Sequence, residues 1–381
     1  MPPNSNLTWD LDSPDTAIQS DDNSSTPHYK GPPLSPSQSD HGGAGHRHRR
    51  RSARALVGLD DNMPPKRHFS GAEHLMWSRI RQTLQEPFAE FLGVMVLSCF
   101  YNGSIAQATL SAGMETAPGG FGYGSFMSVP WGTGIGVMLG IYISGDSGSY
   151  LNPAITLTAC LFRGLPWKSF PSIVLAQLLG AFVANAMVYG NYIAAIDWYS
   201  GPGARLVPPA AKATAQIMAT YPQTFVPQAS QVFSVIIPSG LITAVVFALK
   251  DDYNNGISKA GGNFFPLAMF FLFYGVGVAF GWETGGACNP ALDFSGRLLS
   301  SAVGYPREVW TTGNYYFWVP LLMPFVGAVA GSFFYDALVF TGPSPVNSPW
   351  LGMKRFFDRD IQKQNSRERV EARRNDSTEQ V

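Results

Sequence analysis

Residues 147–154 read SGSYLNPA, and residues 285–291 read GGACNPA. In each stretch the Asn side-chain oxygen can cap a helix, and the Pro that follows suits the first helical position because no backbone donor is lost there. Each Asn-Pro-Ala triplet therefore predicts the start of a helix. The six residues are Asn152, Pro153 and Ala154 in the first triplet, and Asn289, Pro290 and Ala291 in the second.

Both predicted helix starts lie among long apolar segments rather than in polar sequence. The first N–H groups of a helix have no partner within the helix, and hydrocarbon cannot supply one, so such an end must face protein or a wet cavity. One such start occurs in each half of the chain. We therefore predict two half-helices that point their positive ends at one shared site in the middle of a bilayer.

The composition separates a membrane domain from two polar tails. The chain has 381 residues, and its 26 Lys and Arg balance its 26 Asp and Glu, so no global charge indicates a nucleic-acid partner. Residues 87–342 are apolar and nearly free of charge, whereas residues 1–86 and 343–381 are polar. We predict a channel domain over 87–342, a disordered tail over 1–86 and a polar tail over 343–381.

The apolar domain lacks the side chains that catalysis and metal binding usually need. All six histidines precede it, and three cysteines in apolar segments argue against a disulfide framework. No nucleophile–base pair is evident. We predict no catalytic residues, no metal site and no cofactor.

The spacing of apolar segments predicts an all-α membrane protein with six transmembrane helices and two re-entrant half-helices. An 11-residue half-helix is only ~16 Å long, about half a bilayer. Three spans and one half-helix per half make an odd number of crossings, so the halves, 87–191 and 232–342, are inverted repeats joined by a long connection over 192–231. The aromatic residues of this connection indicate that it folds over a mouth. The predicted spans are 88–110, 126–145, 170–191, 232–249, 265–281 and 315–340, and the half-helices are 152–162 and 289–299.

Basic residues predict the orientation. The run 46–51 and the loops at Arg163 and Lys250 are basic, which places both termini on the cytoplasmic side, and we expect the plasma membrane to house the chain. Four basic residues fall in loops assigned to the other side and weaken this rule: Arg205, Lys212, Arg297 and Arg307.

The shared site favours uncharged solutes. Each Asn uses its oxygen in its own cap, so its amide N–H groups can donate to a water or hydroxyl oxygen. The positive helix ends at the same point oppose hydronium and metal cations. Glu90 is an acid within the first span, and it must accept hydrogen bonds from the broken helix or lie in the interfacial zone.

Over residues 87–342 the chain resembles the major intrinsic protein family, the aquaporins and glycerol facilitators. The resemblance rests on both Asn-Pro-Ala triplets and on three short motifs: AEF at 89–91, AQLLG at 176–180, which includes Gln177, and PFVG at 324–327. ATYP at 219–222, LKDD at 249–252 and Asp293 are similar to the glycerol-facilitator branch. The resemblance implies a right-handed six-helix bundle, a homotetramer with one pore per subunit, and passage of water and glycerol, with urea and hydrogen peroxide as further candidates.

Departures from the family pattern concern the selectivity filter. Leu292 stands where members usually carry an Arg that narrows the outer mouth and repels cations. The other filter positions implied by the resemblance are Gly277, Gly286 and either Trp131 or Gly132. These residues predict a wide, apolar constriction, with cation exclusion resting on the half-helix ends alone.

Three supporting positions are also unusual or open to two interpretations. Tyr150 takes the place of a common His, and Val235 stands where the second half would repeat Glu90. Asp293 either favours the helix dipole or widens the mouth, and both interpretations carry equal weight.

Three functions compete. A passive channel is favoured because the spans carry no charged relay. A coupled transporter needs carboxylates in the substrate path, where only Glu90 and Asp293 are candidates. A non-conducting or regulated homologue is the third alternative, because Leu292 is unusual.

Overall fold

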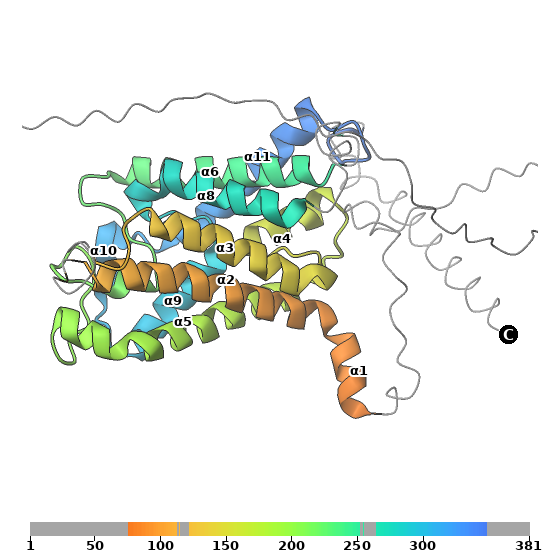
Figure 1. Ribbon diagram of the computed structural model, residues 1–381. Helices are drawn as coiled ribbons and strands as arrows, with labels where there is room; N and C mark the ends of the chain where they lie inside the picture. Colours follow the sequence, from red (N-terminus) through yellow and green to blue (C-terminus); the bar gives the residue numbers. More distant parts are fainter. Residues whose placement is uncertain (1–74, 113, 115–121, 252–253, 255–263, 349–381) are drawn as a thin grey trace, which may run out of the picture. The chain divides into compact units, whose positions relative to one another are not determined.

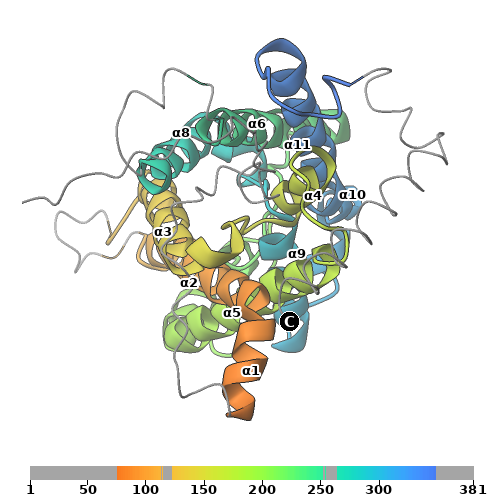
Figure 2. The same ribbon diagram turned by 90° about the vertical axis from the view of Figure 1, so that its right-hand side faces the viewer.

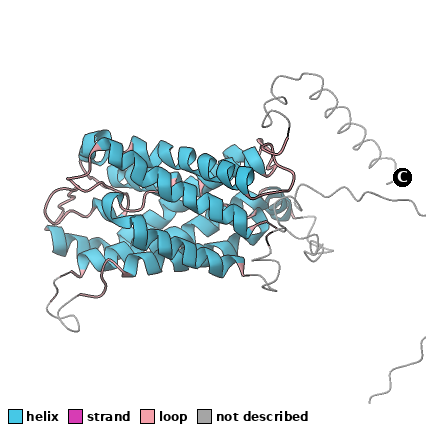
Figure 3. Ribbon diagram, turned by 90° about the horizontal axis from the view of Figure 1, so that it is seen from above, coloured by secondary structure: helices cyan, strands magenta, loops and turns pink. Residues whose placement is uncertain are grey.

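The computed structural model describes residues 75–112, 114, 122–251, 254 and 264–348 (Figure 1). These residues belong to one compact unit, 50–381. Helices and their connections make up the described chain, with no strand among them (Figure 3). The basic run 46–51 and most of both predicted tails lie outside the described residues.

Six long helices form the bundle, as the apolar segments predicted. Five of them are long and apolar enough to span a bilayer, which needs about 20 residues, within the part of the chain that the structure describes. The remaining one, α3, has 17 residues. The six helices are α2 (Gln85–Leu110), α3 (Ser128–Ser144), α5 (Phe170–Ser200), α6 (Gln228–Leu249), α8 (Phe265–Thr284) and α11 (Trp318–Leu338).

Helix boundaries differ from the prediction at three places. A short helix, α1 (Met76–Thr83), lies within the stretch predicted to be a disordered tail, and Trp77 stacks on Phe88 at 6.1 Å. α5 continues past its predicted end at 191 to Ser200. A further helix, α10 (Glu308–Tyr315), with a kink at its end, precedes α11. A helix can extend beyond the bilayer where water or neighbouring loops satisfy its backbone, so hydropathy alone does not fix these ends.

Two half-helices enter the bundle from opposite ends (Figure 1). They are α4 (Pro153–Phe162), with 10 residues, and α9 (Pro290–Ala302), with 13 residues. α4 packs against α11, and α9 packs against α5, so each half-helix contacts the last span of the other half. Viewed along the bundle, α4 and α9 lie between α11 and α5 and complete a ring with the long helices (Figure 2).

Two helix crossings match between the two predicted repeats. α2 packs on α5 in the first half, and α6 packs on α11 in the second. A Cβ atom added to Gly180 would collide with the carbonyl oxygen of Phe91, and one added to Gly327 would collide with that of Ile236. Such close backbone approaches hold membrane helices together where hydrophobic force between them is weak. The contacts also align the two halves, with Phe91 equivalent to Ile236.

The long connection covers one end of the bundle, as expected. It runs from the end of α5 to α6 and contains a short 3₁₀ helix, Ala215–Ile217. Ile217, Met218 and Tyr221 are buried. We call this end the loop-side mouth (Phe126, Thr220, Trp282) and the opposite end, near α1, the tail-side mouth (Tyr150, Arg163, Lys250).

Candidate pore

The two Asn-Pro-Ala triplets meet inside the bundle and hold each other in place. The side-chain oxygens cap their own helices, accepting from Ala154 N at 2.9 Å and from Ala291 N at 3.0 Å. Asn152 Nδ2 donates to the carbonyl of Cys288 at 2.9 Å, and Asn289 Nδ2 donates to the carbonyl of Leu151 at 2.8 Å. An amide nitrogen carries two hydrogens, so one N–H of each Asn remains for the cavity that both side chains line.

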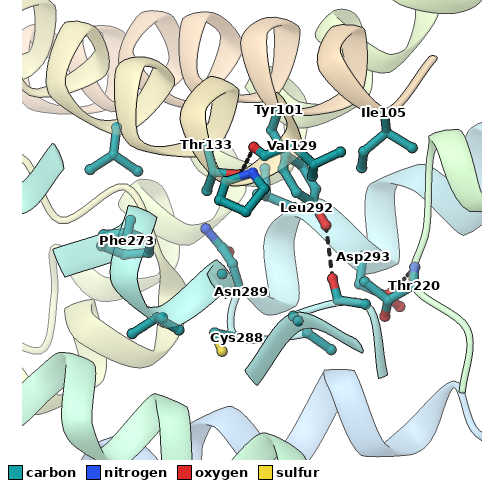
Figure 4. Close-up of a pocket in the computed structure, with 18 of the residues that line it drawn as sticks. Tyr101, Ile105, Val129, Thr133, Thr220, Phe273, Cys288, Asn289, Leu292 and Asp293 are labelled. Carbon is teal, nitrogen blue, oxygen red and sulfur yellow. Dashed lines mark hydrogen bonds between the residues drawn. The ribbon is translucent and has the colours of Figure 1, made fainter. Parts of the chain in front are cut away.

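A cavity of about 600 Å³ runs from the loop-side mouth past this meeting point to Tyr150 and Ile155. Its wall is largely apolar, with side chains such as Val137, Ile242 and Phe273. Gln216 and Tyr221 also line it, but Gln216 Oε1 and Tyr221 Oη are themselves buried and have no hydrogen-bond partner among the described residues. The cavity therefore offers an apolar surface together with the amide groups of Asn152 and Asn289. Figure 4 shows Asn289, Leu292 and Asp293 around it.

Glu90 binds the loop before the first half-helix. It accepts hydrogen bonds from the broken helix, which is one of the two predicted alternatives. The side chain is fully buried. Its carboxylate accepts from Ser147 Oγ at 2.6 Å, from the backbone N–H groups of Tyr150 and Leu151 at 2.8 Å each, and from Gln177 Nε2 at 2.9 Å. Four donors surround the charge, which is how a buried carboxylate is stabilised.

The second half-helix has no acid at the equivalent position, and Asp293 is bound within its own helix instead. Val235 is fully buried there. Asp293 Oδ1 accepts from Arg297 Nε at 2.7 Å, and Oδ2 accepts from Thr220 N at 2.7 Å and from Thr220 Oγ1 at 2.5 Å. The sequence had assigned Arg297 to an outside loop, but the side chain is 2% exposed within α9. Arg297 also donates to the carbonyls of Thr220 and Val309, so it fixes the loop-side connection.

Three of the predicted filter residues line the cavity, and two do not. Gly277, Gly286 and Leu292 are on the wall. Trp131 is 49% exposed with its ring against Phe270 and Tyr274.

Gly132 is also turned from the cavity, because an added Cβ there would lie 2.5 Å from Ser104 Oγ on α2. The inward face of α3 repeats every four residues and carries Val129, Thr133 and Val137. Thr133 therefore lines the cavity where Trp131 or Gly132 was expected.

A second, small cavity of about 20 Å³ lies at the tail-side mouth. Tyr150 and Ile155 line both cavities, so they separate the two. Lys250, the residue after α6, lines the small cavity and donates from Nζ to the carbonyl of Gly148 at 3.0 Å. Burial lowers the pKa of Lys250 to about 8, and the charge of Glu90 opposes this shift.

Comparison with known proteins identifies the family. Residues 76–335 match the model of the major intrinsic protein family. The chain belongs to this family. As a member, it is an integral, multi-pass membrane protein and not an enzyme.

Relatives from fungi are similar over most of the chain. "Aquaglyceroporin-9" of Botryotinia fuckeliana is 45% identical over 300 residues, 79% of this chain and 63% of that protein. "Probable aquaglyceroporin-2" of Gibberella zeae is 48% identical over 285 residues, 74% of this chain and 81% of that protein. The chain therefore spans less than two thirds of the first relative's length.

A solved structure shares the fold. The aquaglyceroporin from Plasmodium falciparum is 28% identical and superposes with a TM-score of 0.57, covering 67% of this chain and 96% of that one.

Proposed function

We propose that this chain is a passive membrane channel for water and small neutral solutes such as glycerol. The observation that carries the proposal is the meeting of Asn152 and Asn289, each with one amide N–H left for the cavity. These donors suit a hydroxyl oxygen, and the positive ends of α4 and α9 oppose cations at the same point. Relatives named as aquaglyceroporins support the same function.

The mixed wall of the cavity fits a polyol. Glycerol has a carbon backbone on one side and hydroxyl groups on the other. Apolar side chains such as Phe273 and Val276 can contact the carbons, while the remaining amide N–H groups of Asn152 and Asn289 can bond the hydroxyls. Urea and hydrogen peroxide are further candidate solutes because both are small and uncharged.

Reconstitution in liposomes tests the function. Purified full-length chain should accelerate swelling under an inward glycerol gradient, without any proton or sodium gradient. A coupled transporter would need such a gradient, and a non-conducting homologue would give no flux above protein-free liposomes.

The filter at the loop-side mouth consists of Gly277, Gly286 and Leu292, with Thr133 in the place expected of Trp131 or Gly132. Leu292→Arg adds length and positive charge to a wall where Gly286 leaves open space. We expect it to lower glycerol flux about tenfold, a barrier change of about 1.4 kcal/mol, and to lower water flux less. Leu292→Met keeps the apolar volume and serves as the control. Unchanged glycerol flux in the Arg variant would contradict this filter assignment.

Orientation and assembly follow the family pattern. We propose that the tail-side mouth faces the cytoplasm of a plasma membrane and that four copies form a homotetramer. The exposed apolar side chains Phe233, Ile237, Leu241 and Val245 recur every four residues on α6 and give it a face for lipid or a neighbouring copy. Cross-linking in native membranes, with mass analysis of the product, tests the tetramer.

A further inference from the structure

Three charged residues line the two cavities among the residues that the structure describes: Asp293, Arg163 and Lys250. Asp293 is paired with Arg297 at 2.7 Å. Arg163 forms a bidentate ion pair with Asp336, with N–O distances of 2.8 and 2.6 Å. Lys250 makes no ion pair within the described ranges. Of the three charged side chains, it is therefore the one that no acidic group of the described residues contacts.

The charge of Lys250 lies beside the path between the cavities. Its Nζ is 5.6 Å from the ring centroid of Tyr150 and 4.9 Å from that of Phe265. Tyr150 lines both cavities, so a solute leaving the main cavity at this end passes the ring and then Lys250. The aromatic faces and the Gly148 carbonyl stabilise the ammonium group without neutralising it.

Other charged groups near Lys250 stand behind the wall rather than on it. Glu90 contacts neither cavity, and four donors surround its carboxylate. Asp251 accepts from Tyr335 Oη at 2.7 Å. The carboxylate of Asp336 contacts Arg163. An ion entering the tail-side cavity therefore meets two positive side chains first, and only that of Lys250 lacks a paired acid among the described residues.

We infer that Lys250 supplies the fixed positive charge that repels cations from this pore, at the tail-side mouth, in place of the arginine that is missing at position 292. The inference rests on the proposed channel function and adds a residue that determines its charge selectivity. With Leu292 at this position, the charged residue on the wall of the main cavity is Asp293, which is paired with Arg297, so the half-helix ends would otherwise act alone. A charge close to the path raises the energy of any cation there, and it leaves uncharged glycerol almost unaffected.

The test compares potassium leak with glycerol flux in liposomes that hold the full-length chain. Lys250→Gln removes the charge and keeps a donor for the Gly148 carbonyl, while Lys250→Arg keeps the charge. We expect Lys250→Gln to raise potassium leak about tenfold or more over wild type at pH 7. Lys250→Arg should keep the low potassium leak of the wild type. Lys168→Gln removes an exposed lysine from a nearby loop and serves as the matched control.

A pH series on the wild type tests the charge without any substitution. Raising the pH from 7 to 9.5 deprotonates Lys250, since its pKa is about 8. Potassium leak should then rise reversibly in the wild type and remain low in Lys250→Arg, whose guanidinium stays charged.

Each failure is distinguishable. A wild type without glycerol flux refutes the channel function itself. Two results overturn the role of Lys250. One is a wild type that conducts glycerol but shows no potassium leak at pH 9.5, and the other is a Lys250→Gln variant whose potassium leak equals that of the wild type. Equal leak in the Gln and Arg variants also overturns it, because shape rather than charge would then matter.

Discussion

The two half-helices begin with the same Asn-Pro-Ala triplet, yet a buried acid binds N–H groups of the loop before the first, and Val235 stands at the equivalent position in the second half. The first loop is held through its N–H groups, since Tyr150 and Leu151 donate to Glu90 at 2.8 Å each. At the second, carbonyls at the end of α8 and at the first loop residue accept hydrogen bonds. Gln223 N donates to Glu283 O at 2.9 Å, Tyr316 Oη to Thr284 O at 3.3 Å, and Tyr101 Oη to Gly285 O at 3.2 Å.

The equivalent positions of the two repeats explain this difference. Alignment through the crossings at Gly180 and Gly327 makes Glu90 equivalent to Val235 and Gln177 equivalent to Pro324. The second half therefore lacks both the acid and the amide that organise the first. Asp293 and Arg297 fix it to the loop-side connection instead. A repeat thus preserves the geometry of the pore while the supporting chemistry changes.

The largest expected effect is the loss of Glu90. Glu90→Leu leaves the N–H groups of Tyr150 and Leu151 buried without an acceptor, at about 1–3 kcal/mol each. Ser147 and Gln177 lose an acceptor as well. We expect roughly 4 kcal/mol or more of destabilisation, measured as a fall in melting temperature in detergent, together with loss of glycerol flux. Glu90→Gln, which keeps one acceptor oxygen, should fall between this variant and wild type. Wild-type stability in Glu90→Leu would show that the first loop does not depend on the acid.

The second-largest loss of stability is expected when Arg297 is replaced. Arg297→Met leaves Asp293 buried without its cation, and breaking such a pair costs about 3–5 kcal/mol. Thr220 still donates to Asp293 at two positions, so we place the effect at the lower end of this range.

Hydrogen exchange locates the damage from Arg297→Met. It should increase at residues 218–221 and remain unchanged at 147–151, which Glu90 holds. Equal increases at both segments would contradict separate supports for the two halves. Asp293→Asn combined with Arg297→Met removes both charges and should recover part of the stability.

The lengths of the apolar segments and the paired triplets were enough to predict the spans and the half-helices, and they gave the broken helix as one of two alternatives for Glu90. The filter position on α3 was beyond such reasoning, because a motif shared with a family does not fix which face of a glycine-rich helix turns inward. Arg297 and Lys250 were missed for another reason. Gly148, the partner of Lys250, belongs to another element, and no spacing along the chain connects the two. The ion pair of Arg297 with Asp293 follows the four-residue helical spacing, but the bonds of Arg297 to the carbonyls of Thr220 and Val309 do not.

The helix crossings at Gly180 and Gly327 are alike in the two halves, so they provide a comparison for the differing supports of the half-helices. Gly180→Ala and Gly327→Ala each place a Cβ against a backbone carbonyl of the facing helix, that of Phe91 or Ile236. Overpacking of this kind costs about 1–3 kcal/mol. We expect the two variants to lose stability by amounts within about 1 kcal/mol of each other, by thermal unfolding in detergent. A much larger loss in one half would mean that the crossings, too, have diverged.

The smallest effect is expected at Val235, the counterpart of Glu90. Its side chain is fully buried in a cluster with Ala287, Tyr316 and Val319, so it acts by packing alone. Val235→Thr keeps the shape and adds a hydroxyl that can bond the carbonyl of Gln231 one helical turn earlier, so the loss should be about 1 kcal/mol or less. The same thermal assay measures it. A gain in stability would instead indicate that an N–H group of the second loop lacks an acceptor in the wild type. The groups that hold the two loops would then differ in degree rather than in kind.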